Sequence, residues 1–205
     1  MLLNQLNKRL TKIPSIYKLE QGDRIVIHKH DDNNIYLVIE GVLLVYKTFT
    51  NGTSICLSII HRGKIINPLF QKHDKHIYFY SIESISVAYI LSLKNNNTKL
   101  LNTLQVKSGR VLLYQQNLLE VSIHKNVKQK LIHLFLMLCE ILGEYRDNYM
   151  IVCLSLSYIT IARIVGSNRN TISKIIFQLE EQKLMLYTKK YFIVYDMVQL
   201  SKRNV

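Results

Sequence analysis

Apolar and polar residues alternate through much of the segment from residue 16 to residue 93. Alternation with a period of two is typical of β-strands that bury one face. Turn-forming residues interrupt the segment at intervals of about ten residues, a spacing typical of an all-β sandwich or barrel. Asn51-Gly52 is the strongest hairpin signal, because this pair fits a two-residue turn. The expected strands include Ile35 to Ile39, Val42 to Phe49 and Ser54 to Ile60.

A helical period replaces this alternation after residue 96. Apolar residues then recur at spacings of four and three, a pattern typical of a coiled-coil seam. A helix packed against its own β-domain would show a similar stripe, so the spacing leaves both arrangements open. The pattern breaks from His124 to Val127, where we expect a hinge, and Lys128 to Leu142 then predicts an apolar core helix closed by Gly143. The stripe consists of Leu100, Leu104, Lys107, Val111, Tyr114, Leu118 and Val121.

The segment from Ser157 to Lys183 predicts two short helices joined by a tight turn. Ser157 can cap the first helix, because its hydroxyl can accept a hydrogen bond from a free backbone amide. Gly166 is expected to end that helix, since glycine tolerates the left-handed conformation needed to leave it. The apolar face of this first helix is expected to consist of Ile159, Ile161, Ala162, Ile164 and Val165.

The second helix of the pair is expected to be capped by Asn168 and to bury a stripe of isoleucine and leucine. Two helices joined in this way form a helix-turn-helix, whose second helix enters the major groove of DNA. The stretch from Leu184 to Tyr195 predicts two strands around a basic turn, a wing that can touch phosphate. A polar helix face is often only solvated, but the order helix, turn, helix, wing is much more specific for DNA binding. The buried stripe consists of Ile172, Ile175, Ile176 and Leu179, and the candidate DNA contacts are Ser157, Ser167, Asn168, Arg169, Asn170, Thr171, Ser173, Lys174, Lys189 and Lys190.

Composition supports a polyanionic partner. The 205 residues carry a net charge of +13, which favours nucleic acid as that partner. The three cysteines share no close spacing and cannot supply a four-ligand metal or iron-sulfur site. The apolar run from Leu131 to Cys139 is interrupted by His133 and is too short to span a bilayer, so no membrane contact is expected.

One set of residues fits enzyme chemistry. Gly22, His28, His30 and Gly41 match the spacing of metal-binding cupins, in which two histidines on one strand point toward a metal ion. Asn34 replaces the expected carboxylate and no second histidine motif follows, so such a site would bind metal poorly. The alternative is that both histidines are ordinary strand residues beside a turn.

The helix-turn-helix resembles the C-terminal DNA-binding domain of the Crp/Fnr transcription regulators. The resemblance implies that Arg169 reads a guanine. It also implies that Lys174, where the family usually has arginine, reads a base or anchors the helix on the DNA one turn later. Lys174 offers a point charge and not the planar fork of arginine, so it cannot make a bidentate contact. The matching residues are Ile161, Gly166, Arg169, Thr171, Ile172, Leu179 and Glu180.

The N-terminal part, from Leu19 to Asp23 and from Ile35 to Tyr46, resembles the effector-binding jelly roll of the same family, a double-stranded β-helix. The resemblance implies an α+β chain in three parts: a jelly roll with a short N-terminal helix over residues 1–96, a central dimerisation helix over 97–124, and a winged helix-turn-helix over 125–205. It further implies a parallel homodimer that binds a palindromic operator in double-stranded DNA and contacts RNA polymerase. A regulator, not an enzyme, is therefore expected.

The effector is predicted from a narrower resemblance. The phosphate cassette of cyclic-nucleotide sensors is absent between Gly63 and Val87, so cyclic AMP is disfavoured. Nearly the whole chain is similar to the nitrogen-control branch of cyanobacteria and plastids, which senses 2-oxoglutarate. This implies a plastid stroma location, although a bacterial cytoplasm would give the same sequence pattern. The implied effector residues are Ile66, Asn67, Leu69, Lys75, Arg110 and Gln115.

Two departures from that branch bear on the effector. Pro68 has no N–H to donate to a carboxylate, and Gln115 stands where the branch has a glutamate that orients the effector arginine. A regulator whose sensor pocket has decayed, and which binds DNA without an effector, is therefore an alternative.

Overall fold

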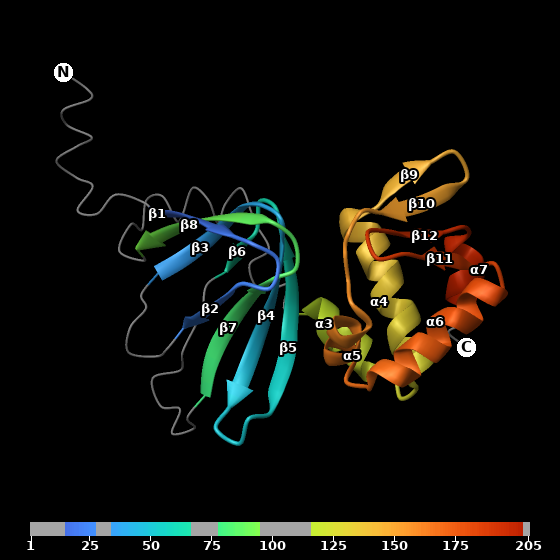
Figure 1. Ribbon diagram of the computed structural model, residues 1–205, viewed down its shortest axis with the longest axis horizontal. Helices are drawn as coiled ribbons and strands as arrows, with labels where there is room; N and C mark the ends of the chain where they lie inside the picture. Colours follow the sequence, from blue (N-terminus) through green and yellow to red (C-terminus); the bar gives the residue numbers. More distant parts are fainter. Residues whose placement is uncertain (1–14, 28–33, 67–77, 95–115, 203–205) are drawn as a thin grey trace.

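The structure is a computed structural model, and it describes residues 15–27, 34–66, 78–94 and 116–202. The β-rich N-terminal part lies beside a C-terminal part that is mostly helical (Figure 1). The domain limits expected at residues 96 and 124 stay predictions, because residues 95–115 lie outside the described ranges.

Two antiparallel four-stranded sheets form the N-terminal part. Their strand orders are β1-β8-β3-β6 and β2-β7-β4-β5, which agrees with the predicted double-stranded β-helix. The strands are β1 Ser15–Leu19, β2 Arg24–Ile27, β3 Asn34–Glu40, β4 Val42–Phe49, β5 Ser54–His61, β6 Ile65–Ile66, β7 Tyr78–Ser84 and β8 Ala88–Lys94.

The predicted hairpin at Asn51-Gly52 is confirmed as the connection between β4 and β5. Gly52 has a φ of +82°, and the backbone N–H of Thr53 donates to Asn51 Oδ1 at 2.9 Å. A second glycine is required for space: a Cβ on Gly41 would lie 2.5 Å from the Cβ of Ala88. Both turns keep β4 in register with its neighbours.

Strand β4 is buried on both faces, which explains its five consecutive buried residues, Val42 to Tyr46. Leu43 and Val45 point into the core between the two sheets. Val42, Leu44 and Tyr46 instead join a second core that they share with the helices. The sheet β2-β7-β4-β5 is therefore the middle layer between the other sheet and the C-terminal part.

The C-terminal part is built around one apolar helix, as predicted. Asn126 caps it by accepting from the N–H of Lys128, and Gly143 ends it. The predicted break between two helices lies at residues 124–126. The elements are α3 Gln116–Ile123, α4 Val127–Leu142, β9 Glu144–Arg146, β10 Tyr149–Val152, α5 Tyr158–Val165, α6 Arg169–Glu181, β11 Met185–Tyr187, β12 Phe192–Val194 and α7 Met197–Lys202.

Helix α3 corrects part of the predicted seam. Leu118 and Val121 are 4% and 1% exposed and pack into the core of their own chain. The apolar residues that point outward are Leu119 and Ile123, at 61% and 77% exposure. The alternative of a helix packed against its own chain therefore holds for these last turns. The earlier seam positions lie outside the described residues.

Among the described residues, no helix combines the length and the hydropathy that crossing a membrane requires.

Candidate DNA-binding surface

The first helix of the predicted helix-turn-helix is α5. Ser157 caps it, and its Oγ accepts from the backbone N–H of Thr160 at 3.0 Å. Gly166 ends it with a φ of +72° and a ψ of 50°. Both predictions for the helix ends are confirmed. Ile159 was wrongly placed on the buried face, because it is 58% exposed.

The tight turn that follows is fixed by backbone hydrogen bonds. The N–H of Ser167 donates to the carbonyl of Ala162 at 2.9 Å, and the N–H of Gly166 donates to the same carbonyl. Helix ends with a glycine in this conformation pair the last free carbonyls. The turn therefore sets the angle between α5 and α6.

The second helix of the pair is α6, which begins as predicted after Asn168. Asn168 Oδ1 accepts from the N–H of Thr171 at 2.8 Å. Arg169, Asn170 and Lys174 are exposed, and Ser173 is partly exposed, so the first two turns present polar side chains to solvent. The predicted apolar stripe is fully confirmed as buried: Ile172, Ile175, Ile176 and Leu179.

The predicted wing is the hairpin formed by β11 and β12. Thr188 holds its turn, because its Oγ1 donates to the carbonyl of Tyr191 at 2.7 Å and accepts from the N–H of Tyr191 at 3.1 Å. Lys189 and Lys190 lie in this turn and are exposed. Both lysines can therefore reach a phosphate without first breaking an ion pair with a described residue.

Two side chains tie the wing to the helix-turn-helix, and sequence reasoning missed both of them. Glu180 on α6 accepts from the backbone N–H of Tyr187 at 2.8 Å. The hydroxyl of Tyr187 donates to the carbonyl of Leu156, directly before the cap of α5. Burial raises the pKa of Tyr187, so this hydroxyl keeps its proton. Neither contact has a local sequence signal.

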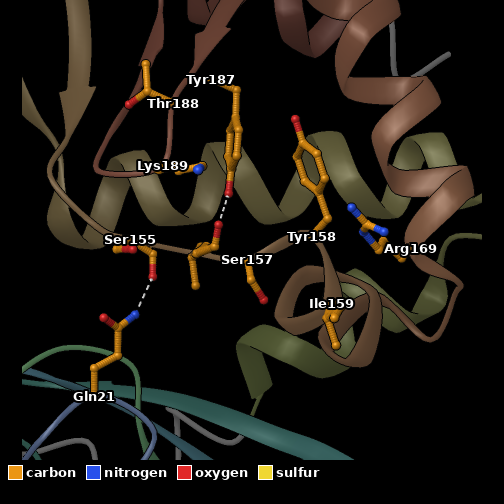
Figure 2. A pocket seen from close by; sticks show the side chains of 10 residues that line it. Gln21, Ser155, Ser157, Tyr158, Ile159, Arg169, Tyr187, Thr188 and Lys189 are labelled. Atoms are coloured by element: carbon orange, nitrogen blue, oxygen red, sulfur yellow. Dashed lines mark hydrogen bonds between the residues drawn. The ribbon is translucent and has the colours of Figure 1, made fainter.

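A cleft of about 700 Å³ lies between the wing, the start of α5 and the start of α6. Figure 2 shows Arg169 and Lys189 approaching it from α6 and from the wing. The rings of Tyr158 and Tyr187 line it and stack with their centroids 5.4 Å apart. The start of α5 carries the positive end of the helix dipole. Lys189 and the start of α5 make their side of this cleft suitable for a phosphate group.

The candidate effector residues are mostly outside the described ranges. Ile66 is buried at the end of β6. The others, Asn67, Leu69, Lys75, Arg110 and Gln115, lie in segments 67–77 and 95–115. Their role as an effector site stays a prediction.

The cupin alternative rests on residues that are also outside the described ranges, since His28 and His30 belong to segment 28–33. Within the described ranges, no three histidine, cysteine, aspartate or glutamate side chains form a group able to hold a metal ion.

No protein-family model matches the chain. The chain is 28% identical over 200 residues to ycf28 of Porphyra purpurea, named as an HTH-type transcriptional regulator, covering 92% of this chain and 81% of the relative. It is 24% identical over 203 residues to the global nitrogen regulator of Synechococcus elongatus, covering 94% and 91%.

Solved structures show the same architecture. A CRP-family regulator from Thermus thermophilus, TTHB099, superposes with a TM-score of 0.73 at 17% identity, covering 92% of this chain and 96% of the other. A CooA variant from Carboxydothermus hydrogenoformans gives 0.72 at 15% identity, covering 94% and 88%.

The chain is similar in sequence to HTH-type and nitrogen regulators and shares the architecture of Crp/Fnr-family regulators. The predicted resemblance and fold class are confirmed by these relatives in sequence and architecture. The expectation of a regulator and not an enzyme agrees with the same proteins, all of which are named as regulators, so the cupin alternative is not supported.

Proposed function

We propose that this chain is a sequence-specific DNA-binding regulator of the Crp/Fnr type that controls nitrogen genes. The observation that carries the proposal is the set of exposed polar side chains at the start of α6, beside a basic wing. In this docking mode, an arginine at the start of the recognition helix can contact guanine O6 and N7. Arg169 holds this position and is exposed. Lys174 adds a second cation one turn later.

The wing and the cleft supply sequence-independent affinity. Phosphate contacts position a protein on the duplex, and base contacts select the sequence. Lys189, Lys190 and the Ser157 end of α5 are proposed to contact phosphate. The chain thus has both kinds of contact on one surface.

A homodimer is proposed as the working unit. Leu119 and Ile123 lie one turn apart on α3 and leave an exposed apolar pair on the outer side of the helix, which a second copy would cover. A dimer places two recognition helices about 34 Å apart, one turn of DNA, and so requires a palindromic operator. RNA polymerase is the further partner proposed for the DNA-bound dimer.

Nitrogen control with 2-oxoglutarate as effector is proposed from the relatives, several of which are named as global nitrogen regulators. Arg110 is proposed to bind the dicarboxylate, for which a guanidinium fork is well suited. Relatives in an alga and in cyanobacteria favour a plastid stroma location. Fractionation of the source cells tests the location, and recovery outside plastids would contradict it.

The second candidate is a regulator that binds DNA without an effector. Pro68 and Gln115 favour it, because both remove groups that the nitrogen-control branch uses around its ligand.

A titration of binding to a GTA-N8-TAC duplex, the palindrome that the family resemblance suggests, tests the proposal. Binding is measured at several salt concentrations, with and without 2-oxoglutarate. Preference over scrambled DNA is expected, together with a gain from 2-oxoglutarate that Arg110→Ala abolishes. Specific binding that ignores the ligand would favour the second candidate, and no specific binding would refute DNA reading.

A further inference from the structure

The helix-turn-helix packs directly on the sheet β2-β7-β4-β5, here called the sensory sheet. One continuous apolar core contains Tyr46 and Cys56 from the sheet together with Ile161 and Ile164 from α5. Cys56 is only 8% exposed there, and burial raises the pKa of its thiol to about 12. An apolar contact alone allows sliding, because dispersion and burial have little directional preference.

A group of charged side chains, here called the Glu83 cluster, crosses this apolar contact. Glu83 extends from β7, and its side chain is only 8% exposed. Arg163 from α5 makes two hydrogen bonds to it, Nη1 to Oε2 at 2.9 Å and Nη2 to Oε1 at 2.7 Å. Arg24 from β2 adds a third, from Nη2 to Oε2 at 2.6 Å. The cluster consists of Arg24, Glu83 and Arg163.

One carboxylate, Glu83, is shared by two arginines in the cluster, so the ionisation of Glu83 depends on both of them. Burial alone would raise the pKa of Glu83, but the hydrogen bonds and charges of the two arginines outweigh it and hold that pKa below its ordinary value. Glu83 is therefore ionised at neutral pH. Arg163 also lies over the ring of Tyr46, with 5.4 Å from Cζ to the ring centroid. A bidentate pair fixes direction as well as distance, which the surrounding apolar contact cannot do.

The position of Glu83 in the fold connects two parts of the proposed mechanism. Strand β7 begins at Tyr78, directly after segment 67–77, which contains candidate effector residues. Glu83 lies near the other end of β7, where it binds Arg163 of α5, the first helix of the helix-turn-helix. The polar side chains at the start of α6 remain exposed while this pair is formed, so the docked arrangement leaves the reading surface open to DNA.

We propose that Glu83 and Arg163 are positioning residues that dock the helix-turn-helix on strand β7, so that the sensory sheet sets the orientation of the recognition helix. This inference rests on the proposed DNA-binding function. In a dimer the two recognition helices must match two half-sites at once. A helix-turn-helix that is free to rotate on either copy therefore lowers the fraction of dimers able to bind.

The three cysteines provide an assay for docking. Cys56 is buried where the sheet meets α5, and Cys139 is buried in α4, within the C-terminal part. Cys153 is exposed. Iodoacetamide labelling followed by mass spectrometry gives a rate for each. Glu83→Gln and Arg163→Gln are expected to accelerate Cys56 labelling by about tenfold, the scale of a lost charge-assisted pair. Cys139 should keep its rate.

Glu20→Gln is the matched control. It makes the same chemical change in the turn after β1, where Glu20 forms an exposed pair with Lys18 at 2.6 Å, and it should leave Cys56 protected. The double variant of Glu83 and Arg163 should label Cys56 no faster than the faster single variant, because both remove one contact. If Cys56 stays at the wild-type rate in both single variants, or if the two effects multiply, the proposal is overturned.

The labelling rate of Cys139 separates global unfolding from undocking. Global unfolding would accelerate the labelling of Cys139 together with that of Cys56, whereas undocking would accelerate only Cys56. If the labelling of both cysteines accelerates in one single variant, the other single variant supplies the same test from the opposite side of the pair. Acceleration of both cysteines in both variants would show a general structural role and would overturn docking as the specific function.

Operator binding completes the test. Glu83→Gln is expected to weaken binding to the palindromic duplex by about threefold or more, and Glu20→Gln to leave it unchanged. Equal or tighter binding by Glu83→Gln would overturn the positioning role. If the wild-type chain shows no preference for the palindrome, the proposed function fails instead, and the Cys56 rates still decide whether Glu83 holds the two parts together.

Discussion

Replacing Tyr187 by phenylalanine isolates one contact that positions the wing. The ring packs against Phe135, Tyr158 and Phe192 at centroid distances of 6.0, 5.4 and 6.3 Å. Phenylalanine can keep all three ring contacts. Only the hydrogen bond from the hydroxyl to the carbonyl of Leu156 is lost, so that a buried acceptor is left without its partner.

The expected loss of stability is about 1–2 kcal/mol, the usual cost of leaving a buried polar group unpaired. For a chain of this size, this corresponds to a fall in melting temperature of about 3–6 °C. Equilibrium urea unfolding measures the change in free energy. Tyr145→Phe is the control, because Tyr145 is 72% exposed, and it should change stability by less than about 0.5 kcal/mol.

The same substitution is expected to weaken operator binding, because the carbonyl of Leu156 directly precedes the cap of α5 and Tyr187 directly precedes the wing turn. Loosening this connection releases Lys189 from its place at the cleft that Arg169 also lines. Equal stability of Tyr187→Phe and the wild type would refute the reasoning about the hydrogen bond. Lower stability with unchanged operator affinity would refute its role in positioning the wing.

Three further predictions concern the helix-turn-helix and its supports. Gly166→Ala should destabilise the chain by about 1–2 kcal/mol in urea unfolding, because alanine is strained at a φ of +72°, whereas Gly166→Asn should recover part of that loss; equal stability of the two would contradict the argument. Burial, with repulsion from His124, lowers the pKa of His133 below 6.5. The contribution of neutral His133 to the free energy of unfolding should therefore be fully present above pH 6.5 and decrease as the pH falls below it. If the urea midpoint of His133→Gln shows the same decrease, another group causes the pH dependence. Replacing both wing lysines by alanine removes four phosphate contacts from a dimer and should make the log–log salt slope shallower by about 3.6; an unchanged slope would place the wing away from the DNA.

Local signals in the sequence predicted local structure well. Ser157, Gly166 and Asn168 each have one conformational preference that a helix end satisfies, and their positions were predicted correctly. Asn51-Gly52 predicted a hairpin for the same reason. The buried stripe of α6 followed from spacing alone, because one face of that helix meets a single core.

Contacts between distant parts of the chain could not be predicted in this way. Glu83 and Arg163 are separated by 80 residues, and either would be read as an ordinary surface charge. Leu118 and Val121 have the spacing of a seam, yet periodicity does not tell whether an apolar face meets a second copy or its own core. Helix α7, which buries Leu200, lies after Asp196, in a tail to which the sequence alone assigns no role. Tertiary packing decides all of these cases.

The most direct test of DNA reading by α6 is a comparison of Arg169→Ala with the wild-type chain on the palindromic duplex and on scrambled DNA, at one fixed salt concentration. A bidentate guanine contact contributes about 1–3 kcal/mol of discrimination. The account predicts that the substitution removes most of the preference for the palindrome while binding to scrambled DNA falls only slightly. An equal loss on both duplexes would make Arg169 a phosphate contact, and no preference in the wild-type chain would contradict sequence-specific reading by this helix.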